Sequence, residues 1–202
     1  SEGVESRLLN YNRAMENSGV HVRIVLKDYR YVDTTSLRTG RALVDYLGAD
    51  IGLGLGATCP NTCGCAYAYA TYNSPGFGWS VCGWNIDLHE MGHSIGLAHG
   101  PENSSNPASG YLFPEFGHGW MSNQCNSAGD IMSYNNYSNE FFNSKLTCAD
   151  GETYVTDRSY ADSAYHLNRV RYDVSIVNDE HNEGTIEALR VAVPESGVLT
   201  ID

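Results

Sequence analysis

Basic residues are scarce in this chain, and lysine is almost missing. Among 202 residues only Lys27 and Lys145 are lysines, and the formal net charge is −12 at pH 7. A protein this acidic does not attract the phosphates of nucleic acids or the headgroups of an anionic membrane. We therefore expect neither nucleic acid nor a membrane surface among its partners.

Long apolar runs are also missing, although 42% of the residues are hydrophobic. No stretch approaches the ~20 consecutive apolar residues of a membrane-spanning helix. No internal repeat or low-complexity tract is present either, so the chain can bury one sizeable core or two small ones. The glycine-rich stretch IGLGLG, which starts at Ile51, lacks the helix and lysine of a phosphate-binding loop, and its glycines are expected to let a helix pack closely on a sheet.

The sequence contains six cysteines, which favour three disulfides and an oxidising compartment in an acidic chain of this size. We expect a secreted, extracellular protein, and a monomer. The alternative is a second metal site made of Cys59, Cys63, Cys65 and Cys82. Because these cysteines lack the paired CxxC spacing of zinc ribbons, the disulfide interpretation is preferred.

The residues with the clearest chemistry lie between His89 and His99, where the sequence is HEMGHSIGLAH. In a helix, His89 and His93 lie on one face, one turn apart, where two imidazoles can bind one ion. Gly96 can adopt the left-handed conformation that ends a helix, so that His99 can return as a third ligand. Three neutral imidazoles leave one zinc position for water, as in catalytic sites, and Glu90 is placed to reach that water.

The added glycine and third histidine make the motif specific, because each reduces chance matches by roughly twenty-fold. Histidines on an ordinary surface helix are the alternative. His21, His166 and His181 have no ligand spacing and are expected to form ordinary hydrogen bonds. His118 could pass for a ligand, but three histidines already fill the protein positions, so it is expected to form an ordinary hydrogen bond in a loop.

HEMGHSIGLAH resembles the HExxHxxGxxH signature of the metzincin metallopeptidases. DIMSY, from Asp130 to Tyr134, is similar to their methionine turn. Within this superfamily the chain is most similar to the bacterial reprolysin-like group that includes peptidyl-Asp metallopeptidases, from about Asn12 to Asp179. The resemblance implies Met132 as a hydrophobic floor beneath a Zn²⁺ ion. The ligands that it implies are His89, His93 and His99.

The resemblance implies a zinc-dependent endopeptidase that hydrolyses peptide bonds with a zinc-bound water and Glu90 as general base. Tyr134 is a second candidate catalytic residue, because a tyrosine at this offset in astacins and serralysins reaches the zinc or the oxyanion. A buried structural tyrosine is the alternative. A catalytically weak protein-binding or adhesion module with a metzincin shell is the alternative function, which loss of Glu90 or a histidine would mark; none is missing.

The pattern of elements, with the resemblance, predicts an α/β (α+β) fold with a twisted mixed sheet, an antiparallel edge strand, a zinc helix and a C-terminal helix. Helices are expected at 5–17, 37–47, 85–97 and 161–177, and strands at 20–26, 49–55, 65–70 and 79–82. In metzincins the edge strand, here CAYAYA at 65–70, binds an extended peptide by strand addition. The expected partner is therefore an extended peptide or protein substrate, with a capped structural edge as the alternative.

Residues 1–180 are expected to form the catalytic domain and residues 181–202 a strand-like tail. Metzincins that resemble this chain begin with a strand inside the sheet, and no such strand precedes the first helix here. The tail carries apolar runs at 189–193 and 198–201, and part of it could supply that strand. The alternatives are that the tail begins a separate module or that the family's first strand was simply cut away. The resemblance also suggests disulfide pairings, with one further bridge within 59–65. These pairings are Cys63 or Cys65 with Cys82, and Cys125 with Cys148.

Overall fold

The computed structural model describes residues 2–32, 36–55, 62–67, 76–80, 84–99, 130–132, 163–175 and 185–192. These residues form an α/β fold, as the sequence predicts. The helices are α1 (Glu2–Asn17), α2 (Leu37–Tyr46), α3 (Trp84–Ser94) and α4 (Ser163–Ser175). The strands are β1 (Arg23–Tyr31), β2 (Ile51–Leu55), β3 (Gly64–Tyr67), β4 (Gly76–Ser80) and β5 (Thr185–Ala192). No helix in these ranges is long and apolar enough to cross a membrane.

The five strands form one mixed sheet in the order β1-β5-β2-β4-β3. Strands β1, β5, β2 and β4 are parallel to one another, whereas β3 runs antiparallel to β4 and lies at one edge. The predicted antiparallel edge strand is therefore confirmed for its first half, and residues 68–70 lie outside the described ranges. Within those ranges, no strand pairs with the outer side of β3.

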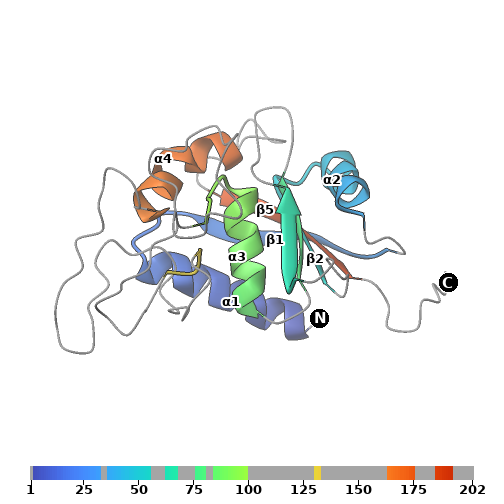
Figure 1. Cartoon of the computed structure of the whole chain (residues 1–202), viewed down its shortest axis with the longest axis horizontal. Coiled ribbons are helices and arrows are strands. Elements are labelled where there is room, and N and C mark those ends of the chain that lie inside the picture. Colours follow the sequence, from blue (N-terminus) through green and yellow to red (C-terminus); the bar gives the residue numbers. More distant parts are fainter. Residues whose placement is uncertain are drawn as a thin grey trace.

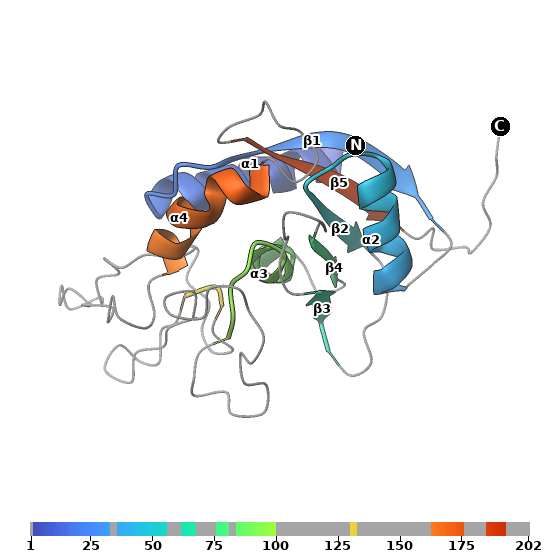
Figure 2. The ribbon, with the colours of Figure 1, turned by 90° about the horizontal axis from the view of Figure 1, so that it is seen from above.

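The C-terminal strand β5 lies in the interior of the sheet, between β1 and β2 (Figures 1 and 2). Ala188 is paired with Leu26 of β1 on one side and with Ile51 of β2 on the other. Part of the tail, including the start of the apolar run at 189–193, thus supplies a sheet strand. The run at 198–201 lies outside the described residues.

Helices cover both faces of the sheet, and each face has its own core (Figure 2). Helices α1, α3 and α4 pack on one face, where residues such as Met15, Leu88 and Leu167 are fully buried. Helix α2 covers the other face through a smaller cluster. That cluster consists of Val44, Ala49, Phe77 and Trp79. The helix that carries His89 and His93 belongs to the face with the larger core.

The glycines of β2 make room for side chains on the α2 face of the sheet. A Cβ on Gly52 would lie 2.3 Å from Cγ2 of Val44 and 2.5 Å from Cδ2 of Phe77. A Cβ on Gly54 would lie 1.9 Å from Cε3 of Trp79. Gly52 therefore allows helix α2 to pack closely, as expected, whereas Gly54 accommodates an indole ring.

Glycines in the left-handed conformation follow the ends of two helices, although α3 ends at Ser94, three residues before the predicted boundary at 97, and α1 begins at Glu2 rather than Glu5. Gly19 (φ 66°) ends α1, and Gly96 (φ 98°) follows the last turn of α3. Beyond each glycine the backbone N–H folds back onto the helix: Val20 donates to Met15 O at 2.9 Å, and Leu97 to Gly92 O at 2.9 Å. These bonds satisfy carbonyl groups at the helix ends.

Two strand predictions were wrong in their boundaries. β1 begins at Arg23 and runs on to Tyr31, beyond the apolar alternation, because an edge strand can expose polar side chains. β4 begins at Gly76, three residues before the predicted start at 79. A Cβ on Gly76 would lie 2.5 Å from Ser94 O, so a glycine lets β4 approach α3 closely there.

The outer edge of β1 is partly covered by a side chain of α1. Asn12 donates from Nδ2 to Ile24 O at 2.8 Å and accepts from Ile24 N at 2.7 Å through Oδ1. This pair of bonds satisfies two backbone groups that the edge would otherwise leave open. At the other edge of the sheet, the described cysteines Cys63 and Cys65 are disulfide-bonded. The other cysteines lie outside the described residues, so the pairing stays a prediction.

Candidate metal centre

Helix α3 holds the first two histidines in place because its apolar residues are anchored in the core. Leu88, Met91 and Ile95 are at most 3% exposed and pack with α1, α4 and the sheet. His89 and His93 lie on another face of the same helix, with only 4% and 7% exposure. The turn at Gly96 then brings His99 back toward them, as the spacing predicts.

The three imidazoles converge on one point through their Nε2 atoms. Nε2 of His89 lies 3.2 Å from Nε2 of His93 and 3.0 Å from Nε2 of His99, and the third separation is 2.9 Å. The three residues form a group that can hold a metal ion. With Zn–N distances of ~2.0–2.1 Å, the donors of a tetrahedral zinc site would lie about 3.3 Å apart, close to the observed separations.

The tautomers of two histidines follow from their Nδ1 partners. Nδ1 of His89 lies 2.7 Å from Ile131 O, and Nδ1 of His93 lies 2.8 Å from Leu97 O. A carbonyl oxygen can only accept, so each neutral ring carries its proton on Nδ1 and has a lone pair on Nε2. Two lone pairs thus face each other at 3.2 Å, and His99 has at most one proton to offer them. A cation at their centre resolves this conflict, and the donor set therefore fits a metal ion.

The pKa values of these histidines favour the neutral form that metal binding requires. Burial lowers the pKa of His89, and burial with the neighbouring histidines lowers that of His93 far below its usual value. Burial and the charge of His89 lower the pKa of partly buried His99 to about 4. All three rings are therefore neutral at neutral pH.

Met132 packs against α3, the helix that carries His89 and His93. Its side chain is fully buried, and a Cβ on Gly92 would lie 2.5 Å from its Sδ. Gly92 thus allows Met132 to lie directly against α3 between the two histidine turns. The residue before it, Ile131, supplies the carbonyl that orients His89. Tyr134 lies outside the described residues, so its candidate role stays a prediction.

Asp130 fixes this turn, a role that the sequence analysis missed. Its Oδ1 accepts from Met132 N at 3.0 Å, and its Oδ2 accepts from Ser163 Oγ at 3.2 Å, at the start of α4. The first bond is typical of an Asp that stabilises a turn two residues on, and this local signal is readable from the sequence. The second bond joins segments that are far apart in the sequence, so the sequence does not reveal it.

Glu90 lies beside the histidines and is 5% exposed. Its side chain fills a space next to two strands: a Cβ on Gly64 would lie 2.3 Å from its Oε1, and a Cβ on Gly78 would lie 3.0 Å from its Cβ. Among the described residues, Oε2 of Glu90 has no hydrogen-bond partner. Burial, with a smaller contribution from the charge of Asp87, raises the pKa of Glu90 to about 8. This carboxyl group is therefore largely protonated at neutral pH when no cation lies beside it.

Asp87 links the metal-binding helix to α1, and the sequence analysis missed this residue as well. It is fully buried, forms an ion pair with Arg7 and accepts a hydrogen bond from Tyr11 Oη at 2.7 Å. A charged residue in the first turn of an otherwise apolar helix face was the available signal. Its partners are about eighty positions away in the sequence, so they required the structure.

The other histidines do not extend this group where the structure describes them. His21 is exposed, and His166 is buried on α4, but neither joins the three-histidine group. His118 and His181 lie outside the described residues.

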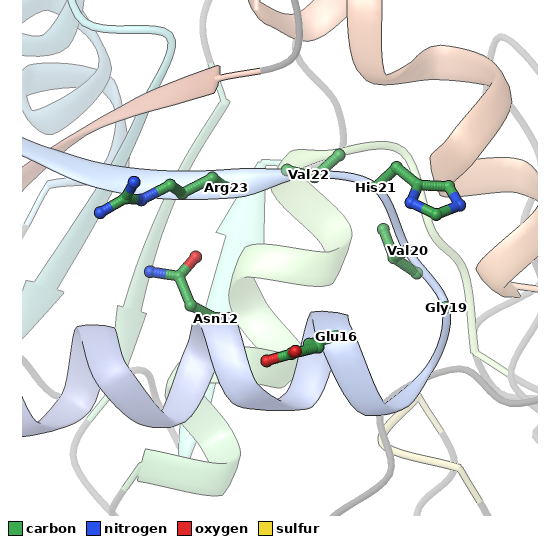
Figure 3. Close-up of a pocket in the computed structure, with 7 residues that line it drawn as sticks. All are labelled: Asn12, Glu16, Gly19, Val20, His21, Val22 and Arg23. Atoms are coloured by element: carbon green, nitrogen blue, oxygen red, sulfur yellow. The ribbon is translucent and has the colours of Figure 1, made fainter.

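A separate hollow of about 330 Å³ lies where α1 turns into β1 (Figure 3). Asn12 and Glu16 reach it from α1, and Arg23 from the first residue of β1. None of its lining residues belongs to the three-histidine group. The hollow is therefore distinct from the candidate metal centre.

The fold and the site together define an α/β protein with a buried group of three histidines that can hold a metal ion. No family model matches the chain, and no curated protein matches it. A chain in a solved structure described as "Structure of a chaperone-substrate complex" is similar to it, with 22% identity and a TM-score of 0.62. The match covers 87% of this chain but 31% of that one, so this chain spans about a third of the matched chain. At this identity the likeness concerns the fold alone.

Proposed function

We propose that this protein is a zinc-dependent endopeptidase of the metzincin type, similar to the bacterial reprolysin-like group. The observation that supports this most is the convergence of three Nε2 atoms, separated by 2.9–3.2 Å, beside the buried carboxylate of Glu90. A structural zinc site uses four protein ligands, whereas three histidines leave one position for chemistry. Within the described residues, no other His, Cys, Asp or Glu side chain joins this group as a fourth ligand.

Zinc is the proposed ion because three neutral imidazoles suit it and the donor separations are close to tetrahedral. When bound, zinc lowers the pKa of water toward neutrality and polarises a carbonyl group. His89 and His93 are held in the correct tautomer by Ile131 O and Leu97 O. Such outer hydrogen bonds orient ligands and increase their basicity.

Glu90 is the proposed general base. Its carboxylate takes a proton from the attacking water and delivers it to the amine nitrogen of the departing peptide fragment. Burial raises the pKa of Glu90 in the metal-free site, and a bound cation would lower it again, so that the group can accept and release a proton near neutral pH. Burial beside Gly64 and Gly78 holds the group in one place.

The proposed substrate is an extended peptide or protein segment that pairs with β3. This strand is at the sheet edge, contacts α3 and borders Glu90 at Gly64. Main-chain hydrogen bonds to an open strand bind a peptide largely regardless of its side chains. A peptide aligned in this way would run past the carboxylate and the histidines together.

The proposed setting is extracellular, with a monomeric protein that binds neither nucleic acid nor membranes. The disulfide-bonded state of Cys63 and Cys65 supports an oxidising compartment, and the net charge of −12 supports the lack of polyanionic partners. Candidate partners are therefore protein substrates in the surrounding medium.

Hydrolysis of a denatured protein tests the proposal. Purified protein should cleave unfolded casein, a chelator should stop cleavage, and one equivalent of Zn²⁺ should restore it. Glu90→Gln should bind zinc but fail to cleave, which separates proteolysis from a contaminant. If the protein binds zinc and unfolded chains but never cleaves them, the protein-binding module is the better description.

A further inference from the structure

The side chain of Glu90 lies in a slot formed by two glycines on neighbouring strands. Gly64 of β3 forms the tighter wall: a Cβ there would lie 2.3 Å from Oε1, 2.7 Å from Cγ and 2.8 Å from Cδ of Glu90. Gly78 of β4 forms the other wall, with a Cβ that would lie 3.0 Å from Cβ of Glu90. The three atoms nearest to a Cβ on Gly64 all belong to Glu90.

The strand cannot easily move away from this carboxylate. Gly64 is paired with Ser80 of β4, and Ala66 with Gly78. Ser80 and Gly78 are buried, and β4 packs directly on α3. The two chain neighbours of Gly64, Cys63 and Cys65, are disulfide-bonded. A side chain at position 64 would therefore have to displace Glu90 rather than β3.

We infer that Gly64 is a positioning residue for Glu90 and that the edge strand sets where the carboxylate can act. This rests on the proposed function, in which Glu90 is the base and β3 aligns the substrate. A single residue of β3 then serves both tasks: its backbone belongs to the edge that receives the peptide, and its missing side chain admits the carboxylate. The base and the substrate are thereby placed by the same element.

Gly64→Ala tests the inference through kinetics. The variant should keep one zinc per chain and a KM for a peptide substrate within about 3-fold, while kcat falls about 100-fold, as small misplacements of a catalytic group do. Gly3→Ala, which adds the same methyl group on α1 where nothing lies within 4 Å of it, should keep kcat within about 3-fold. A Gly64→Ala variant with normal kcat would overturn the inference.

A second measurement does not depend on activity. In metal-free protein, Gly64→Ala should lower the melting temperature by about 5 °C, as overpacking does. In a Glu90→Ala background the same change should cost almost nothing, because the clashing atoms are gone. An equal loss in both backgrounds would refute the slot. If the wild type cleaves nothing but the effects of Gly64→Ala and Glu90→Ala on melting temperature are strongly coupled, the slot is upheld and the proposed peptidase is refuted.

Discussion

At the scale of single residues, the candidate metal centre keeps its ionisable groups uncharged over a wider pH range than water would. Two histidines donate from Nδ1 to backbone carbonyls, which leaves their Nε2 lone pairs pointing at each other. Glu90 is buried with an oxygen that lacks a hydrogen-bond partner in the described part of the chain. Such arrangements cost stability and are typical of sites that are organised for a ligand or a reaction.

Glu90→Gln should lower turnover by at least ~100-fold while the protein keeps its metal, because a general base contributes that much.

The same change should alter stability in the metal-free protein. The folded pKa of Glu90 is raised from 4.5 to about 8, so its contribution to stability is complete below 4.5 and is lost as pH rises through 8. The melting temperature should therefore fall less between pH 5 and pH 9 in Glu90→Gln than in the wild type. Equal losses would contradict the buried, unpaired carboxylate.

The histidines should respond to pH in the opposite direction. Their folded pKa values lie below the usual 6.5, to about 4 for His99, so their contribution to stability is present above 6.5 and is lost as pH falls. Protons also compete with the metal for the same nitrogens. Zinc content measured after dialysis should therefore fall between pH 6.5 and pH 4. Full zinc retention and activity at about pH 4 would argue against a three-histidine site.

At the scale of elements, the site depends on the turn at residues 130–132, which is hydrogen-bonded to His89 of α3 and to Ser163 of α4. Asp130→Ala removes the bonds to Met132 N and Ser163 Oγ and releases the segment that presents Ile131 O to His89. We expect zinc affinity to fall about 10–100-fold, the usual effect of losing an outer partner of a ligand. Competition with a chromogenic chelator measures it. Ser163→Ala, which keeps the turn bond, should have a smaller effect, and equal affinities for both variants and the wild type would exclude this role.

The elements also show what could be predicted from the sequence. Gly19 and Gly96 ended their helices as expected, because a glycine after a helical pattern is a local signal. The edge position of β3 came from the family resemblance and is confirmed. The start of β4 was predicted three residues too late, because Gly76 belongs to the strand by letting it approach the backbone of Ser94, a contact that residue types do not reveal. The Nδ1 partners Ile131 O and Leu97 O are backbone atoms, which no residue type reveals.

The position of β5 gives a prediction at the same scale. Removal of residues 185–202 should leave β1 and β2 without the strand that pairs with both. The protein should then be insoluble or lose about 3–5 kcal/mol of stability, because its core is disrupted. Removal of residues 193–202 alone should leave the sheet intact. Chemical denaturation compares the two variants. If the longer truncation melts like the parent, β5 is not a structural strand.

At the scale of the whole molecule, the sheet is completed by a segment from the far end of the chain. Both apolar runs of the tail looked like strands, but periodicity does not say which neighbours a strand will have. The alternatives, a sheet strand or a separate module, were therefore left open by the sequence. Ala188 of β5 pairs with Leu26 and Ile51 and packs against the larger core, to which Leu88 and Met91 of α3 also belong. Stability of the sheet and integrity of the site are thus linked.

Zinc stoichiometry, measured by native mass spectrometry together with cleavage of an unfolded protein, tests the central claim most directly. We predict one zinc per chain in the wild type and in Glu90→Gln, and cleavage by the wild type alone. His89→Ala should lose both zinc and activity, whereas His21→Ala, a histidine outside the group, should keep both. A wild type that binds no zinc, or a His89→Ala variant that keeps its zinc and its activity, would contradict the account.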